Sequence, residues 1–156
     1  MTAAQPVPAA PAPREWTEVR RRVEHVDTDA SGVVHFSRYA SWLETAVLEN
    51  LDRLGAGLGD LARANLELAV VELRMHYHAP VRFLDRVRVR ARVERVGPAR
   101  VQVSGEISRE DHPGDATRCA SGSLLLGAVD LPTGAPSLLP ENVRTTLKEC
   151  SVRAQR

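Results

Sequence analysis

The chain has little cysteine and almost no lysine. Only two of its 156 residues are cysteine, and neither Cys119 nor Cys150 lies in a spacing typical of a metal or redox site. This argues against a disulfide framework and predicts a protein of the reducing cytoplasm. Of the 21 basic residues 20 are arginine, with Lys148 the exception, a bias that genomic base composition explains as well as a binding role does.

The chain also lacks a long apolar run and a large net charge. No stretch approaches the ~20 apolar residues of a membrane helix, and residues 1–13 lack the basic start of a secretory signal. The 21 basic and 20 acidic residues nearly cancel, which argues against a nucleic-acid or membrane-surface binder. We expect a flexible Pro/Ala-rich tail over 1–14, one domain over 15–149 and a C-terminal tail over 150–156.

Two helical patterns stand out. Apolar side chains recur every three or four residues from Tyr39 to Leu54, which predicts a helix with one broad buried stripe that Gly55 ends. A short second helical piece is expected over 58–64, and Pro140 starts a C-terminal helix that ends near residue 149.

Alternation with period two dominates the rest of the chain. It predicts half-buried strands over 71–77, 87–93 and 101–107, with further strands over 16–26 and 117–129. The arginines that alternate with 87–93 indicate a solvated sheet face. The order of strand, long helix and four strands in meander-like succession predicts an α+β fold, in which an antiparallel sheet wraps one helix.

The loop before the long helix carries two carboxylates, Asp27 and Asp29, followed by Gly32. The first turn of a helix exposes unpaired N–H groups and the positive end of the helix dipole, which suits an oxygen that becomes negative during a reaction. A reactive carboxylate and an oxyanion donor would then come from one short segment.

Three blocks of the chain resemble the 4-hydroxybenzoyl-CoA thioesterase family of hotdog-fold acyl-CoA thioesterases. They are 27–46 (DTDASGVVHFSRYASWLETA), 77–85 (YHAPVRFLD) and 120–141, in the family's order and spacing. The resemblance implies a hotdog fold that works as a homodimer or homotetramer, with the acyl-thioester site between subunits. It implies hydrolysis of an acyl-CoA or acyl-carrier-protein thioester to an acid and a thiol, without a dissociable cofactor.

The resemblance also assigns candidate catalytic residues. The family's catalytic carboxylate aligns with Asp29, as nucleophile or as general base, and the N–H that polarises the thioester carbonyl aligns with Phe36. His35 either assists the reaction or packs at the subunit interface. Tyr39, on the apolar stripe of the helix, and Glu44, on its flank, are further candidates. His25 is a weaker one.

The remaining candidates bind substrate or hold the loop. Asp27 is interpreted mainly as a turn former that hydrogen-bonds loop amides, while Gly32 and Val34 are assigned to substrate binding. CoA carries phosphates that need cations, and in the run that aligns with the family's basic segment only Arg100 is basic. A carrier-protein substrate therefore stays open.

The sequence also permits a metal site, a different reaction or a non-catalytic role. His76 and His78 share one face of a predicted strand, but no third ligand has a suitable spacing, so no metal is predicted. A hotdog hydratase or dehydratase acting on an acyl thioester would use the same fold, and a non-catalytic acyl-thioester binding protein is a third possibility. The acyl group itself is not encoded in any local pattern.

Overall fold

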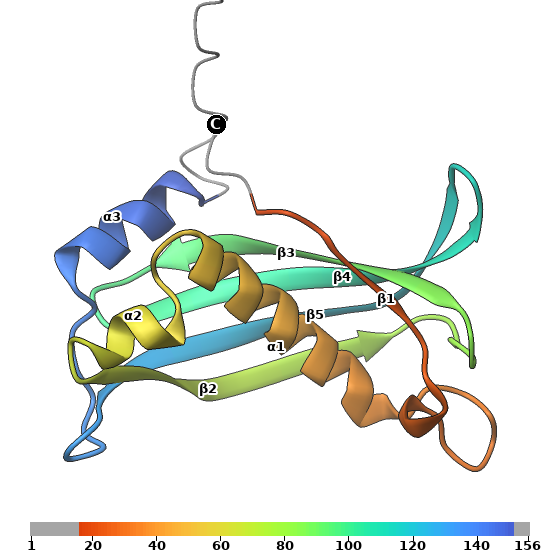
Figure 1. Cartoon of the computed structure of the whole chain (residues 1–156), viewed down its shortest axis with the longest axis horizontal. Helices are drawn as coiled ribbons and strands as arrows, with labels where there is room; N and C mark the ends of the chain where they lie inside the picture. Colours follow the sequence, from red (N-terminus) through yellow and green to blue (C-terminus); the bar gives the residue numbers. More distant parts are fainter. Residues whose placement is uncertain (1–15, 152–156) are drawn as a thin grey trace, which may run out of the picture.

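The computed structural model describes residues 16–151, where one long helix lies across one face of a five-stranded antiparallel sheet (Figure 1). The strands are β1 (Val19–Arg22), β2 (Leu66–Tyr77), β3 (Arg86–Val96), β4 (Arg100–His112) and β5 (Asp115–Asp130). The helices are the 3-10 turn η1 (His25–Asp27), α1 (Phe36–Arg53), α2 (Leu58–Ala62) and α3 (Glu141–Glu149).

The strand order is β1-β3-β4-β5-β2, and every neighbouring pair is antiparallel. The predicted four-strand meander is therefore wrong for β2, because only β3, β4 and β5 follow one another in the sheet. Residues 78–85 carry the chain from β2 across to β3, and Val81 in this crossing segment is fully buried. A segment of this length need not close a tight hairpin, so the alternation of the flanking strands left the neighbour of β2 undetermined.

The predicted long helix and its buried stripe are confirmed. The buried side chains of α1 include Tyr39, Trp42, Leu43 and Val47, and Gly55 takes a positive φ of 77° just past its end. The helix approaches the sheet closely at Gly105 of β4, where a Cβ atom would overlap the Cδ1 atom of Leu43. A larger residue here would require the Leu43 side chain to move, and its Cβ atom would also lie 3.0 Å from the Arg90 carbonyl oxygen.

The two strands with the clearest alternation differ in burial. In β3 the valines at 87, 89 and 93 are fully buried and the intervening arginines face outward, as predicted. In β2 the side chains of Val71, Leu73 and Tyr77 are 45–50% exposed, so the predicted half-burial is wrong within one chain. The reason is that β2 is an edge strand, which pairs with β5 on one side only.

The ends of the chain also differ from prediction. The expected first strand shrinks to Val19–Arg22, because the chain turns into η1 at His25. Cys150 and Ser151 are buried, and Ser151 pairs with Val93, so both belong to the packed domain and not to the expected C-terminal tail. The expected tail over 1–14 lies outside the described residues. Over 16–151, no helix has the length and apolar character needed to cross a membrane.

Candidate active site

The segment between η1 and α1 folds back on itself as a tight turn. The Asp29 N–H donates to the Val33 carbonyl at 2.8 Å, and the Gly32 N–H donates to the Asp29 carbonyl at 3.0 Å. Gly32 has a φ of 80°, a conformation that side chains disfavour, and Thr28 pairs with Val34 across the turn. The turn therefore returns the chain to the start of α1 directly beside Asp29.

Asp29 is exposed at the tip of this turn. Its Oδ1 atom accepts a hydrogen bond from the Ser31 N–H at 2.8 Å, and its second oxygen has no partner among residues 16–151. The first contact fixes the orientation of the carboxylate. The second oxygen is free to act on a substrate or on water.

Asp27 has different surroundings. Its side chain is buried, with Oδ2 accepting from the Glu24 N–H at 2.8 Å and Oδ1 lying 3.5 Å from Nε of Arg38. Its carbonyl accepts the His35 N–H at 2.8 Å. These contacts tie η1 to the first turn of α1 and occupy both carboxylate oxygens.

The start of α1 leaves one backbone donor free. His35 is the N-cap, where its Nδ1 accepts the Ser37 N–H at 3.2 Å and its carbonyl accepts the Arg38 N–H at 2.9 Å. In the part of the chain that the structure describes, no acceptor takes the Phe36 N–H. Phe36 is thus the first-turn donor left for a ligand, at the positive end of an 18-residue helix.

Aromatic side chains border this donor. The Phe36 ring is 66% exposed and lies 4.3 Å from the His35 ring, centroid to centroid. Tyr77, at the end of β2, donates its hydroxyl to the Phe36 carbonyl at 2.9 Å. Its ring contacts that of Tyr39 edge to face, with centroids 5.3 Å apart. Burial raises the pKa of Tyr39 to about 12, so this phenol is neutral at physiological pH.

Glu44 lies farther along α1. It is eight residues beyond Phe36, or roughly 12 Å along the helix axis, beside a small cavity of about 140 Å³. The other lining residues are apolar and come from α1, α2, β2 and β5: Val47, Leu48, Leu58, Leu68, Val70, Leu124 and Leu126. Within a single chain, Glu44 therefore lies away from Asp29 and beside an apolar pocket.

Two of the candidate substrate-binding residues, Val34 and Arg100, lie far from each other. Val34 is buried and donates its N–H to the Val81 carbonyl at 2.8 Å, which joins the loop to the crossing segment. Arg100 begins β4, whereas Arg109 of the same strand donates to the Pro80 carbonyl near the loop. Nine residues of strand span roughly 30 Å, so within one chain Arg100 lies at the opposite end of the sheet from Asp29.

The minor candidates have structural contacts. The His25 ring packs edge to face on Phe83 at 6.0 Å, and His78 Nε2 lies 2.9 Å from the Ser121 hydroxyl. Within 16–151, no group of three or more His, Cys, Asp or Glu side chains is placed to hold a metal ion.

Sequence reasoning missed the contact of Tyr77 with Phe36. Tyr77 belongs to block 77–85 of the family resemblance, but its place in an alternating strand suggested only a packing role. The signal that could have found it was its position at the strand end, next to the crossing segment with Pro80. Arg109 was missed in the same way, since nothing local links it to Pro80, 29 positions away.

The fold and the loop before α1 define a class. A sheet that packs on one long helix, with an exposed carboxylate on the turn just before that helix and a free N–H at the helix start, suits attack on a carbonyl group. The comparisons with known proteins agree: the family model described as "Thioesterase superfamily" matches residues 31–115, more than half of the chain. The chain belongs to the thioesterase superfamily.

Individual proteins that are similar to this chain include one hydrolase and two solved structures. The chain is 29% identical over 143 residues to a 1,4-dihydroxy-2-naphthoyl-CoA hydrolase of Synechococcus sp. (strain CC9605), covering 88% of this chain and 93% of the relative. A hypothetical protein from Thermus thermophilus superposes with a TM-score of 0.77 at 26% identity, over 87% of this chain and 98% of that one. A 1,4-dihydroxy-2-naphthoyl-CoA thioesterase from Synechocystis superposes with a TM-score of 0.75 at 23% identity, over 84% and 94%. The predicted hotdog fold and thioester-hydrolase class are confirmed.

Proposed function

We propose that this thioesterase hydrolyses an acyl-CoA thioester with Asp29 as the catalytic carboxylate and the Phe36 N–H as oxyanion donor. The unpaired N–H at the start of α1, beside the turn that presents Asp29, carries this proposal. Attack on the thioester turns its carbonyl oxygen into an oxyanion. A fixed N–H at a helix start stabilises that charge more than it stabilises the neutral carbonyl.

Asp29 can act in two ways. As a general base it takes a proton from water while the hydroxide adds to the carbonyl carbon; the C–S bond then breaks and the thiolate leaves. As a nucleophile its free oxygen adds directly, the thiolate leaves, and water hydrolyses the resulting anhydride. Trapping of the anhydride with hydroxylamine in a single turnover separates the two, because only the nucleophilic route forms an acyl-enzyme. In ¹⁸O-labelled water, ¹⁸O in Asp29 further shows that water attacks the aspartyl carbonyl of that anhydride.

We assign His35 an assisting role. Because its Nδ1 accepts from Ser37, the neutral ring carries its proton on Nε2, which can donate to the thioester carbonyl or to the departing sulfur. Tyr39 supports the site through its contacts with Tyr77, Gly32 and Val34 shape the loop that meets the substrate, and Glu44 stands at the apolar pocket. Neither route needs a dissociable cofactor.

We propose an aromatic acyl-CoA as the substrate class, acted on in the cytoplasm. The name of the Synechococcus sp. relative, a naphthoyl-CoA hydrolase, supports a CoA thioester with an aryl group. The exposed rings of Phe36 and Tyr77 at the start of α1 supply surfaces on which an aryl group can pack. Membership of the narrower 4-hydroxybenzoyl-CoA thioesterase family is part of this proposal.

We further propose that the enzyme works as a homodimer, alone or within a homotetramer, joined along β2. The edge of this strand exposes backbone groups together with Val70, Val71, Leu73 and Tyr77. Antiparallel pairing of two β2 strands about a two-fold axis covers these side chains. It also brings the Arg100 end of one protomer toward the Asp29 end of the other, which suits a site between subunits.

A thiol-release assay tests the reaction. Purified enzyme is given aryl-CoA, alkyl-CoA and acyl-carrier-protein thioesters, and the Asp29→Asn variant serves as the inactive reference. We expect release of free CoA from aryl-CoA with no change in acyl-chain unsaturation. Activity on none of the three substrates, or hydration of the acyl chain, contradicts the proposal.

The assembly is tested by light scattering after gel filtration. Leu73→Glu places a charge in the proposed contact, whereas Arg74→Glu, on the opposite face of the same strand, is the matched control. We expect the first variant to become monomeric and lose activity, and the second to remain assembled. Two oligomeric variants would show that β2 is not the interface.

A further inference from the structure

Four arginines lie in two directly opposed pairs on the outer face of β1 and β3. The register places Arg20 opposite Arg88 and Arg22 opposite Arg86. Because Val87 is fully buried on the other face, these side chains point away from α1. Strand spacing and the two-residue repeat set their Cβ atoms at the corners of a rectangle of roughly 5 by 7 Å. We call these four residues the arginine quartet.

The arginine quartet is poorly neutralised within the chain. Arg22 and Arg86 have no carboxylate within 4.0 Å among residues 16–151. Nε of Arg88 lies 3.5 Å from Oε1 of Glu110, yet it is shielded from solvent and forms no hydrogen bond. Like charges directly opposite on neighbouring strands destabilise a sheet.

The fourth member shares its carboxylate. Nη2 of Arg20 lies 3.1 Å from Oε1 of Glu18, whose second oxygen accepts from Nε of Arg90 at 2.8 Å. Nη1 of Arg20 also lies 3.8 Å from Oε1 of Glu110, so Arg20, Arg88 and Arg90 share the two carboxylates of Glu18 and Glu110. A local excess of positive charge follows, although the net charge of the whole chain is only +1.

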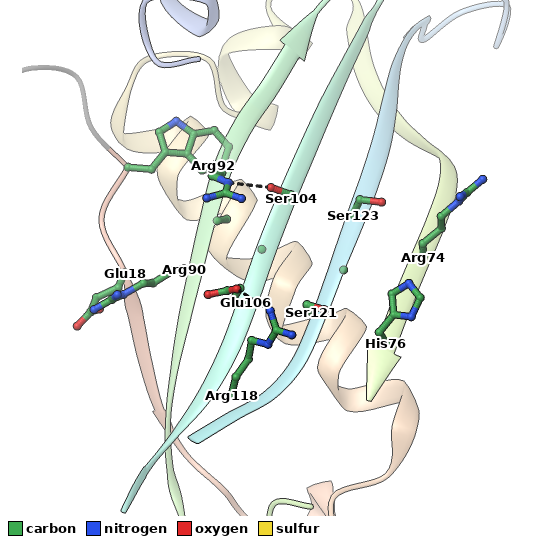
Figure 2. Close-up of a pocket in the computed structure, with 14 residues that line it drawn as sticks. Glu18, Arg74, His76, Arg90, Arg92, Ser104, Glu106, Arg118, Ser121 and Ser123 are labelled. Atoms are coloured by element: carbon green, nitrogen blue, oxygen red, sulfur yellow. Dashed lines mark hydrogen bonds and ion pairs between the residues drawn. The ribbon is translucent and has the colours of Figure 1, made fainter. Parts of the chain in front are cut away.

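The rest of the outer face shows a different arrangement. Figure 2 shows the neighbouring hollow of about 700 Å³, in which Arg118 of β5 and Glu106 of β4 point toward one another. Their side chains form an ion pair at 3.3 Å, and Arg92 pairs with Glu94 at 2.7 Å. These two arginines each have a carboxylate partner, whereas Arg22 and Arg86 of the arginine quartet have none among the described residues.

The position of the arginine quartet connects it with the candidate active site. Arg22 and Arg86 stand at the strand ends next to the loop, where the Val23 N–H donates to the Asp85 carbonyl at 2.9 Å. A cavity of about 250 Å³ is lined there by Arg20, Arg21, Arg22, Arg86, Val87 and Glu110. A second hollow of about 440 Å³ is lined by β1 together with the acidic residues Glu24, Asp27 and Glu49.

We propose that the arginine quartet is a binding site for phosphate groups, and that the nucleotide end of the acyl-CoA substrate supplies them. The CoA part of this statement rests on the proposed function. Guanidinium groups bind phosphate oxygens through two parallel N–H donors. Four of them on a small rectangle match a ligand with several phosphate oxygens better than a single carboxylate. The bound phosphates relieve the repulsion between the opposed pairs.

Binding measurements test this site directly. The test variant is Arg22→Gln/Arg86→Gln, and the matched control is Arg92→Gln/Arg118→Gln, which removes the same charge from ion-paired positions of the same face. Calorimetry is run with CoA, dephospho-CoA and inorganic pyrophosphate. We expect the test variant to bind CoA roughly tenfold more weakly, while the control changes its affinity by less than about twofold.

Kinetics distinguish this proposal from the proposed function. In the test variant the KM for acyl-CoA should rise while kcat, and the KM for the same acyl-pantetheine, stay unchanged. Turnover with an unchanged KM and unchanged CoA affinity overturns the phosphate site while leaving the proposed function intact. CoA affinity that depends on the arginine quartet, without any turnover, supports the site and removes the proposed function. An equal loss in both variants, or a loss seen only with an acyl carrier protein, overturns the site.

A folding control keeps the test interpretable. Removal of two unneutralised arginines should leave the Tm of the ligand-free protein unchanged or raise it, because like-charge repulsion is reduced. Pyrophosphate should raise the Tm of the wild type and of the control variant, but not that of the test variant. A Tm increase by pyrophosphate in the test variant contradicts the proposal.

Discussion

The loop before α1 has two halves that use the same side chain differently. In the first half, Asp27 is buried in η1 and both of its carboxylate oxygens have partners. In the second half, Asp29 is exposed on a turn, with one oxygen held by Ser31 and the other open to solvent. The chemical type of the residue is the same, so the surroundings decide its role.

The difference shows how this short segment can be both rigid and reactive. The buried half fixes the backbone, since the Asp27 carbonyl holds the His35 N–H at the start of α1. The exposed half presents a carboxylate on that fixed frame. This arrangement suits catalysis, because the reactive group must be accessible to substrate while buried residues fix its position.

The largest expected effect comes from the exposed half. Asp29→Asn keeps the side-chain oxygen that accepts the Ser31 N–H but removes the basic and nucleophilic charge. We expect kcat to fall by roughly 10²–10⁴, with an unchanged Tm, as measured by thiol release and thermal denaturation. Wild-type turnover in this variant would falsify the assignment of Asp29.

Substitution of Asp27 in the buried half should lower the stability of the fold. Asp27→Ala leaves the Glu24 N–H without its acceptor and removes the carboxylate beside the Arg38 guanidinium, which keeps its hydrogen bond to the Val26 carbonyl. We expect the free energy of unfolding to fall by roughly 2 kcal/mol, measured by urea denaturation. Asp29→Ala is the matched control, with a loss well under 1 kcal/mol expected at this exposed position. Equal losses in the two variants would remove the distinction between the halves.

A smaller effect is expected at the support of the oxyanion donor. Tyr77→Phe keeps the ring but removes the hydroxyl that donates to the Phe36 carbonyl. One neutral hydrogen bond contributes about 1 kcal/mol, so kcat should fall about fivefold. KM should change little, since the ring contacts remain. An unaltered kcat would show that Phe36 is held by the helix alone.

The smallest effect concerns Tyr39 and alkaline pH. Burial raises its pKa from 10.0 to about 12, so the unfolded chain loses this proton before the folded one does. The contribution of Tyr39 to stability is complete below pH 10 and declines as the pH rises from 10 to about 12. Tyr39→Phe should flatten the stability profile in this window, as followed by urea denaturation at several pH values. A profile as steep as that of the wild type would contradict the shift.

The local sequence pattern predicted correctly those helices and strands whose buried side chains recur with the period of the element itself. The stripe from Tyr39 to Leu54 predicted α1, and the alternation of Val87, Val89 and Val93 with arginines predicted β3 and its buried face. The family resemblance, carried by three ordered blocks, added the hotdog fold and the thioesterase class. It also pointed to the loop that holds Asp29.

Local pattern failed where the neighbour of an element matters. The valine and leucine side chains of β2 have the alternation of a half-buried strand, but their exposure depends on which strand or subunit lies beside them. The register that opposes the arginine quartet is likewise a property of two strands that lie some 60 residues apart in the chain. Neither relation has a signature in a window of adjacent residues.

The sequence by itself determined the long helix, the alternating strands and a carboxylate loop with a glycine turn, because these depend on side-chain periodicity and backbone freedom within short segments. The tertiary structure alone decided which aspartate is buried and which is exposed, and which first-turn N–H of α1 stays free. It also brought Tyr77 to Phe36 across 41 positions. These outcomes depend on packing and hydrogen-bond partners from distant segments, and burial is fixed only when those segments meet.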